Sequence, residues 1–302
     1  MAGIAHSETL GKRPSALQAA ADYWQLTKPE VNLLVLFSAL AGFVLGERGP
    51  LNFLLLIATL LGTLLVASGT GTLNQYLERE SDRTMRRTAE RPLPAGRLEA
   101  KTARNFGLIL AALGGALLWF AANPLASLLA LATLASYLLL YTPLKKRTPL
   151  CTLVGAFPGA MPPLIGWAAA HGSLGATAWE LYAILFLWQF PHFLAIAWMY
   201  REDYARAGLR MLPARDTRGL WTSREILAFL FALIPVSLLP VWMGHAGLAY
   251  TTGALAAGSY FIWRGMRLAR ERTAGMARQV VFASIIYLPV VFGLITLGRL
   301  SF

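Results

Sequence analysis

Three polar side chains recur at every fourth position where a long apolar run ends. They are Asn74, Glu78 and Asp82. At about 100° per helical residue they fall within about 80° of one another on one helix face, and they span about 12 Å along the axis. An amide and two carboxylates form an all-oxygen ligand set, which suits Mg²⁺. Glu80 falls on the opposite face and is left out of the set. The alternative is an ordinary helix end whose Glu and Arg side chains pair in water.

Arginines follow this motif closely. Arg83, Arg86, Arg87 and Arg91 stand in one short segment that ends in Pro92-Leu93-Pro94. Guanidinium groups bind phosphate oxygens with two parallel hydrogen bonds. The segment could therefore hold a phosphate ester. The alternative is that the same charges contact lipid headgroups at the membrane surface.

A histidine and an aspartate form a second candidate pair near the end of another apolar run. His192 follows Pro191, and Asp203 comes eleven residues after the histidine. On one continuous helix the two side chains would lie about 20° apart around the axis and about 16 Å apart along it. Pro191 removes a helical hydrogen bond, so a kink is expected there. The imidazole has three open roles: a hydrogen-bonded structural residue, a metal or haem ligand, or a proton donor.

The composition places these residues in a membrane protein. Of the 302 residues, 56% are hydrophobic and only 14% are charged, whereas a soluble globular chain carries about 25% charged residues. The mean hydropathy is +0.53, and the apolar residues gather in runs long enough to cross a bilayer as helices. A soluble fold and intrinsic disorder are thereby excluded. The single cysteine, Cys151, excludes an internal disulfide framework.

The apolar runs predict an all-α, polytopic membrane protein, a bundle of nine transmembrane helices with functional loops on the cytoplasmic side. They are rich in Leu and Ala and lack the two-residue alternation of membrane β-strands. We expect a cytoplasmic N-terminal tail over residues 1–25 and one transmembrane domain over residues 26–302. The nine predicted spans are about 31–46, 51–73, 105–122, 125–143, 150–170, 178–200, 226–243, 247–263 and 280–298.

The basic residues give the predicted orientation. With nine spans, 25 of the 27 Lys and Arg residues fall on one side, Lys12, Arg13 and Lys28 among them, and only Arg48 and Arg299 fall on the other. The positive-inside rule puts the larger group in the cytoplasm, with the N-terminus inside and the C-terminus outside. The net charge of +12 is then a topology signal, and no nucleic-acid partner is predicted.

Several stretches, taken in order, resemble a known family. Asn74-x₃-Glu78-x₃-Asp82 is similar to the first Asn/Asp-rich motif of the intramembrane aromatic prenyltransferases, the UbiA superfamily. Within it, the chain resembles the protohaem IX farnesyltransferase (haem O synthase) group from about residue 22 to 215, a group that also has nine helices and a cytoplasmic catalytic face. The stretches are Leu26-Thr27-Lys28-Pro29, Asn74-Gln75-Tyr76-Leu77-Glu78-Arg79, Arg87-Thr88-x-x-Arg91-Pro92-Leu93-Pro94, Tyr141-Thr142-Pro143-Leu144-Lys145, Pro162-Pro163-Leu164-Ile165-Gly166-Trp167, Gln189-x-Pro191-His192 and Asp203-Tyr204-x-x-Ala207-Gly208-x-x-Met211-Leu212-Pro213.

The resemblance implies an enzyme of the cell membrane, surrounded by lipid. Its reaction would transfer a farnesyl group from farnesyl diphosphate to a vinyl group of protohaem IX (haem b), giving haem O for haem–copper oxidases. It implies Mg²⁺ as cofactor, held on the diphosphate by Asn74, Glu78 and Asp82, with Asp203 holding a second Mg²⁺. It implies haem A synthase or a terminal oxidase as a partner that takes up the product. It makes His192 a candidate haem-binding residue, beside the structural role. The candidates for binding diphosphate or haem propionates are Arg83, Arg87, Arg91, Lys145, Lys146 and Arg201.

Two positions depart from the superfamily pattern. Glu78 stands where Asp is usual, which changes the reach of the carboxylate but not its charge. Ala207 stands four residues after Asp203, so a second Asp-x₃-Asp motif is absent and the second Mg²⁺ is in question. That absence argues against the main alternative, a prenyltransferase acting on a quinone precursor or a chlorin. A transporter or a passive haem carrier is a third possibility, but transporters place ionisable residues near the bilayer midplane.

Overall fold

The chain is helical throughout the part that the structure describes. The structure is a computed structural model, and it describes residues 15–300. No strand occurs among these residues. Lys12 and Arg13, which the orientation count includes, lie outside them. The helices are α1 (Ala16–Leu26), α2 (Pro29–Gly46), α3 (Phe53–Arg83), α4 (Ala100–Leu117), η1 (Leu118–Ala122), α5 (Pro124–Ser136), η2 (Tyr137–Tyr141), α6 (Thr142–Leu144), α7 (Cys151–Gly159), α8 (Pro162–His171), α9 (Ala176–Met199), α10 (Arg201–Arg206), α11 (Leu212–Arg215), α12 (Leu220–Ser237), α13 (Leu239–Trp242), α14 (Leu248–Glu271) and α15 (Ala274–Leu300).

Each predicted span corresponds to one helix or to consecutive helices. Within the described residues, eight spans are long and apolar enough to cross a membrane. The ninth, α14, has the length but is less apolar on average, since arginines follow one another along its final turns. The prediction of an all-helical, multi-span membrane protein is confirmed.

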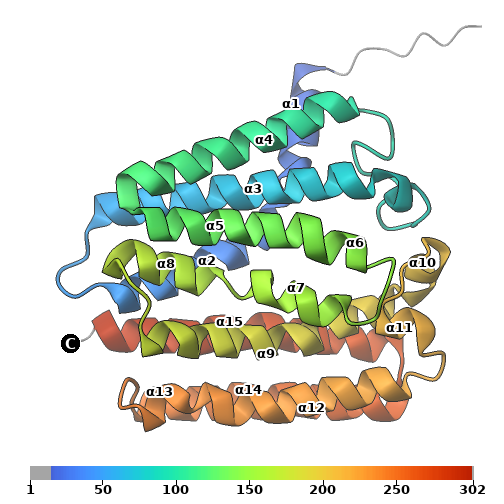
Figure 1. The fold of residues 1–302 in the computed structure, drawn as a ribbon. Helices are drawn as coiled ribbons and strands as arrows, with labels where there is room; N and C mark the ends of the chain where they lie inside the picture. The colour runs from blue at the N-terminus through green and yellow to red at the C-terminus, as the bar shows by residue number, and fades with distance from the viewer. Residues whose placement is uncertain (1–14, 301–302) are drawn as a thin grey trace, which may run out of the picture.

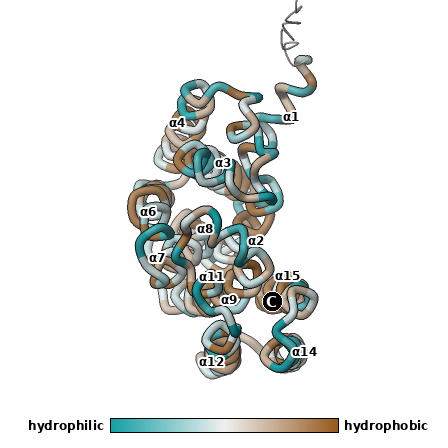
Figure 2. Tube along the Cα trace, turned by 90° about the vertical axis from the view of Figure 1, so that its right-hand side faces the viewer, coloured by the Kyte–Doolittle hydropathy of each residue, from teal (hydrophilic) through white to brown (hydrophobic). Residues whose placement is uncertain are grey.

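The long helices lie side by side with their axes roughly aligned (Figure 1). One end of the bundle holds the last turn of α3 together with α6, α10 and α11. Figure 2 looks onto this end, where hydrophilic residues mark many of the connections. The opposite end holds α13 and the last turns of α15. There Arg299 Nη2 donates to the Glu47 carbonyl at 3.3 Å, next to Arg48. The two basic residues predicted to lie outside thus occupy the same end of the bundle.

Two spans contain a π-helical turn and a third is divided in two. The π turns are η1, which continues α4, and η2, which continues α5. The third break separates α7 from α8 and precedes Pro162-Pro163, which begin α8. Proline suits the first turn of a helix because its missing N–H has no partner there anyway. π turns occur often at functional sites, and η2 carries two tyrosines that line the cavity described below.

Helices α2 and α8 pack with their backbones in contact. A Cβ built on Gly166 would lie 1.9 Å from the Ala39 carbonyl oxygen, and one on Gly42 would lie 2.0 Å from that of Pro163. Such separations exclude any side chain larger than hydrogen. Small residues are how membrane helices approach this closely, and the contact holds α2 against the centre of the bundle.

We expect Gly166→Ala to destabilise the protein, because the added methyl group must push α2 and α8 apart. Overpacking of this kind costs about 1–3 kcal/mol, so thermal unfolding in detergent should begin several degrees lower. Gly49→Ala is the matched control, since a Cβ there meets nothing within 4 Å. Equal unfolding temperatures for the two variants would contradict the packing argument.

Helix α1 lies against the segment that follows α3. Asp22 is buried, and its carboxylate accepts three hydrogen bonds from the Arg97 guanidinium at 2.9–3.1 Å. The Tyr23 and Phe106 rings meet edge to face, with centroids 4.9 Å apart. Part of the predicted N-terminal tail is therefore a packed helix. The domain boundary between residues 25 and 26 stays a prediction.

Candidate active site

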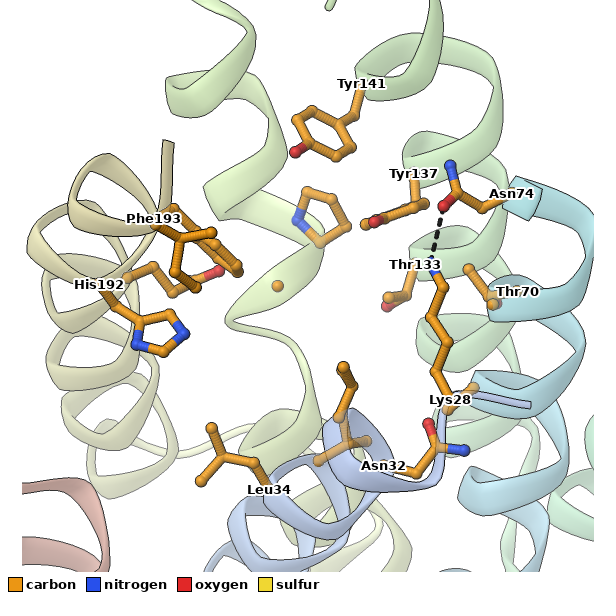
Figure 3. A pocket seen from close by; sticks show the side chains of 18 of the residues that line it. Lys28, Asn32, Leu34, Thr70, Asn74, Thr133, Tyr137, Tyr141, His192 and Phe193 are labelled. Carbon is orange, nitrogen blue, oxygen red and sulfur yellow. Dashed lines mark hydrogen bonds between the residues drawn. The ribbon is translucent and has the colours of Figure 1, made fainter. Parts of the chain in front are cut away.

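A cavity of about 430 Å³ opens between the helices. This volume is within the range of ligand-binding pockets. Residues of α2, α3, α5, η2, α7, α8, α9 and α10 line it, together with Lys28, Lys145 and the segments that follow α3 and α10. Figure 3 shows His192 and Phe193 of α9 on one side, with Lys28, Thr70 and Asn74 facing them. The lining therefore combines polar and charged groups, many of them on or near α3, with apolar side chains such as Val35, Leu185 and Phe193.

The predicted oxygen ligands all line this cavity from α3. The helix continues unbroken to Arg83, so Asn74, Glu78 and Asp82 keep the common face that their spacing predicts. Asn74 and Asp82 are each only 1% exposed. Glu80 points away and pairs with Arg79 and Arg83. The helix periodicity alone thus brings three oxygen-bearing groups to one wall.

Each of these three groups contacts a basic side chain from another part of the chain. The contacts are Lys28 Nζ to Asn74 Oδ1, Lys145 Nζ to Glu78 Oε1 and Arg91 Nη1 to Asp82 Oδ2, each at 2.8 Å. Two carboxylates and three basic side chains therefore share a buried region. Because the basic side chains outnumber the carboxylates, the region can receive an anion.

The two lysines respond differently to burial. Burial and, secondarily, the nearby Arg91 charge lower the pKa of Lys28 to about 7, although the Glu78 carboxylate acts to raise it. Burial also acts to lower the pKa of Lys145, but the Glu78 carboxylate, in direct contact, holds the net pKa well above its usual value. Lys145 is thus firmly cationic, whereas the charge of Lys28 depends on which anion it faces.

Asn74, Glu78 and Asp82 could hold Mg²⁺ only if water or a substrate phosphate supplied the remaining ligands. No group of three or more His, Cys, Asp or Glu residues that could hold a metal occurs within residues 15–300. Two carboxylates and an amide fall short of a full coordination shell. Mg²⁺ commonly takes one or two carboxylates and completes its shell with water and substrate phosphates. The donors on α3 suit that arrangement.

Asp203 does not line the cavity. It is 8% exposed, forms an ion pair with Arg206 and accepts a hydrogen bond from the Arg87 backbone N–H at 3.3 Å. The Arg87 side chain does line the cavity, and its guanidinium lies 4.9 Å from the Tyr200 ring centroid. Asp203 is therefore linked to the cavity indirectly, through its hydrogen bond with the Arg87 backbone. Its predicted role as a ligand of a second Mg²⁺ stays a prediction.

Three other predicted basic residues also lie away from the cavity lining. Arg83 bonds to Glu80 and to the Pro94 carbonyl. The Arg201 guanidinium lies 4.4 Å from the Trp198 ring centroid, and Lys146 is exposed. Arg87, Arg91 and Lys145 are the predicted basic residues that the fold brings to the lining.

His192 lines the cavity from the opposite side. Its Nδ1 lies 2.6 Å from Ser284 Oγ, and its ring stacks on Trp188 with centroids 4.7 Å apart. The expectation of one helix running from His192 to Asp203 is wrong. Helix α9 ends at Met199, because Tyr200 leaves the helical backbone region with φ −112° and ψ 23°. The chain changes direction there before α10 begins.

Lys28, Tyr137, Tyr141 and Gln189 are cavity residues to which sequence reasoning gave no site role. Lys28 was counted as a topology charge and as part of the Leu26-Thr27-Lys28-Pro29 stretch, and the one signal that could have singled it out is its place directly before Pro29, at the start of α2. Tyr137 and Tyr141 look like ordinary apolar-run residues, and only the η2 turn brings both to the lining. Gln189 also lines the cavity, and its amide nitrogen donates to the Ala156 and Leu185 carbonyls.

Comparison with known proteins decides the family. The model of the UbiA prenyltransferase family matches residues 35–286. The chain belongs to the UbiA prenyltransferase family. It is therefore an enzyme of the membrane, a prenyltransferase, as its motifs predict.

Curated relatives in the UbiA family match almost the whole chain. A protoheme IX farnesyltransferase of Solibacter usitatus is 50% identical over 287 residues, covering 92% of this chain and 98% of the relative. One of Koribacter versatilis is 43% identical over 297 residues, covering 95% and 96%. Since nearly the full length of each relative is covered, the match extends well beyond the motifs.

Solved structures of UbiA proteins share the fold. A digeranylgeranylglyceryl phosphate synthase superposes with a TM-score of 0.76 at 19% identity, over 94% of this chain and 99% of the other. A UbiA homolog from Archaeoglobus fulgidus, bound to GPP and Mg²⁺, gives 0.65 at 16% identity, over 91% and 99%. At these identities the likeness concerns the fold alone.

Proposed function

We propose that this prenyltransferase transfers a farnesyl group from farnesyl diphosphate to a vinyl group of protohaem IX, giving haem O. One observation carries the proposal: a single cavity has the Asn74, Glu78 and Asp82 group on one side and His192 on the other. The first side suits a diphosphate and the second suits a porphyrin with its iron. The printed names of the relatives that are 50% and 43% identical support this choice of acceptor.

The first chemical step breaks the allylic C–O bond of farnesyl diphosphate, and the bonding electrons leave with the diphosphate. Positive charge placed around a leaving group lowers such a barrier. Lys28, Lys145 and Arg91 supply it in a buried region, where charge interactions are strong. Asn74, Glu78 and Asp82 would hold Mg²⁺, which, when bound, adds further neutralisation of the diphosphate.

The second step joins C1 of the farnesyl cation to the terminal vinyl carbon. The positive charge then moves to the inner vinyl carbon beside the porphyrin, where a water oxygen adds and releases one proton. Apolar lining residues such as Val35, Val66 and Leu185 keep bulk water from the first cation. The product is a hydroxyethylfarnesyl haem, a more hydrophobic molecule that stays in the membrane.

A direct assay tests the proposal. Membranes containing the protein are given protohaem, farnesyl diphosphate and Mg²⁺, and the extracted haems are analysed by liquid chromatography with mass spectrometry. We expect a haem heavier by one farnesyl group and one hydroxyl group. An expressed, folded protein that leaves protohaem unchanged but prenylates a quinone precursor would overturn the haem assignment.

We also propose that the metal is required at the α3 site. Removing divalent ions with EDTA should lower product formation at least about 100-fold, because the diphosphate would then leave with only the protein cations to neutralise it. Adding back Mg²⁺ should restore the rate. The measurement is product per minute in the same membranes before and after chelation. Undiminished turnover in EDTA would contradict a metal role for this site.

We propose that the enzyme lies in the cell membrane with its N-terminus in the cytoplasm and its C-terminus outside. Single cysteines in a Cys151→Ala background test this, since the native thiol is buried. Arg48→Cys should react with an impermeant maleimide in intact cells, and Lys146→Cys only after permeabilisation. The reverse pattern would invert the orientation.

A haem A synthase or terminal oxidase is the proposed recipient of the product, and its failure to co-purify in mild detergent would count against that partnership.

A further inference from the structure

Three residues outside the charged group form one constellation between α9 and α15. Ser284 of α15 is fully buried, and it contacts two residues of α9 that line the cavity. Its Oγ lies 2.6 Å from His192 Nδ1. Its backbone carbonyl accepts a hydrogen bond from Trp188 Nε1 at 2.9 Å. One serine thus holds both aromatic side chains on this wall.

The hydrogen bonds of Ser284 determine which nitrogen of His192 faces the cavity with a lone pair. Ser284 Oγ donates its hydrogen to the Val281 carbonyl at 2.5 Å, and a carbonyl can only accept. The hydroxyl therefore accepts from the imidazole, which places the imidazole hydrogen on Nδ1. Nε2 is left with a free lone pair. Metal-binding histidines usually donate a hydrogen bond from one ring nitrogen and bind the metal with the other.

Trp188 fixes the plane of the imidazole. Its indole ring stacks on His192 with centroids 4.7 Å apart and 18° between the planes. Since the indole is itself held by the Ser284 carbonyl, neither ring can turn without breaking a buried contact. Figure 3 shows the His192 ring directed into the cavity, across from Lys28 and Asn74.

We propose that Ser284 is a positioning residue, which orients His192 so that Nε2 binds the iron of a porphyrin substrate. The inference rests on the proposed function, because it requires haem in this cavity. Iron bound at His192 would anchor the porphyrin in the same cavity as the α3 side, where the allylic cation would form. Ligation is a single coordinate bond from Nε2 to iron and needs no co-reactant.

The test compares two porphyrins without turnover. The purified full-length protein in nanodiscs is titrated with ferric protohaem and with metal-free protoporphyrin IX, and absorption and electron paramagnetic resonance spectra are recorded. We expect protohaem to bind at least about 10-fold more tightly and to show a histidine-ligated signature. His192→Ala should remove both the preference and the signature, and added imidazole should restore the signature.

The positioning role is tested by Ser284→Ala. When a metal-binding histidine loses the group that hydrogen-bonds its other ring nitrogen, metal affinity typically falls about 10-fold or more. The preference for protohaem should therefore fall by about that factor, while metal-free protoporphyrin binds unchanged. Ser237→Ala is the matched control, a buried helix serine that bonds to Tyr287 of α15 and does not line the cavity. It should leave the preference unchanged. Unfolding temperatures of both variants show that each is folded.

The outcomes separate this inference from the proposed function. If His192→Ala keeps both the signature and the preference, the inference is overturned whatever the product assay shows. If His192→Ala keeps the preference for protohaem, the histidine-ligated signature and haem O formation, the proposed function stands and the histidine is only structural. If wild type binds neither porphyrin and makes no haem O, the proposed function fails first and takes the inference with it.

Discussion

Asp82→Asn should lower prenyl transfer at least about 100-fold while leaving the protein folded. The side chain is almost fully buried, lines the cavity and pairs with Arg91 at 2.8 Å. The amide keeps its size and can still accept a hydrogen bond from Arg91, but it loses the negative charge that a metal requires. Removing one group that stabilises charge in a transition state costs about 10²–10³-fold in rate. The readout is product per minute by mass spectrometry, with unfolding temperature measured in parallel.

Glu80→Gln is the matched control for Asp82→Asn. It makes the same kind of change two residues earlier on the same helix, but the Glu80 side chain is exposed and pairs only with Arg79 and Arg83. Its rate should stay within about twofold of wild type, because surface ion pairs contribute about 0–1 kcal/mol. Equal losses in the two variants, or full activity in Asp82→Asn, would refute the assignment of the α3 face as the metal site.

Lys145→Met should both destabilise the protein and abolish turnover. The Lys145 and Glu78 side chains are 12% and 16% exposed and meet at 2.8 Å. Without the lysine, Glu78 is left as a buried charge that has lost its ion-pair partner. Removing one member of a buried ion pair costs about 3–5 kcal/mol, which should lower the unfolding temperature in detergent by several degrees. Turnover should fall as well, since the diphosphate would lose a neighbouring cation.

A double variant separates the two effects of Lys145→Met. Glu78→Gln with Lys145→Met removes the uncompensated charge, so stability should return most of the way towards wild type. Activity should stay low, because both the proposed metal donor and the cation are gone. Lys146→Met is the control, an exposed neighbour that does not line the cavity, and it should behave as wild type. If the double variant is no more stable than Lys145→Met, the two side chains do not act as a pair.

The sequence by itself determined the local features of this protein. Apolar runs of membrane length predict the helices, because hydrocarbon leaves the backbone no other hydrogen-bond partners. A spacing of four puts Asn74, Glu78 and Asp82 on one face whatever surrounds them, since helix periodicity depends only on neighbouring residues. Both features are seen in the structure.

Features that depend on distant partners were decided by the tertiary structure. Lys28 meets Asn74 across 46 residues, Lys145 meets Glu78 across 67, and His192 meets Ser284 across 92. Spacing carries no information about such pairs, because they form only when separate helices pack. The fold also leaves Asp203 outside the cavity lining, where it pairs with Arg206, while the next residue, Tyr204, lines the cavity. Local helix periodicity thus determined which oxygen donors lie on one wall. Helix packing determined which cations face them.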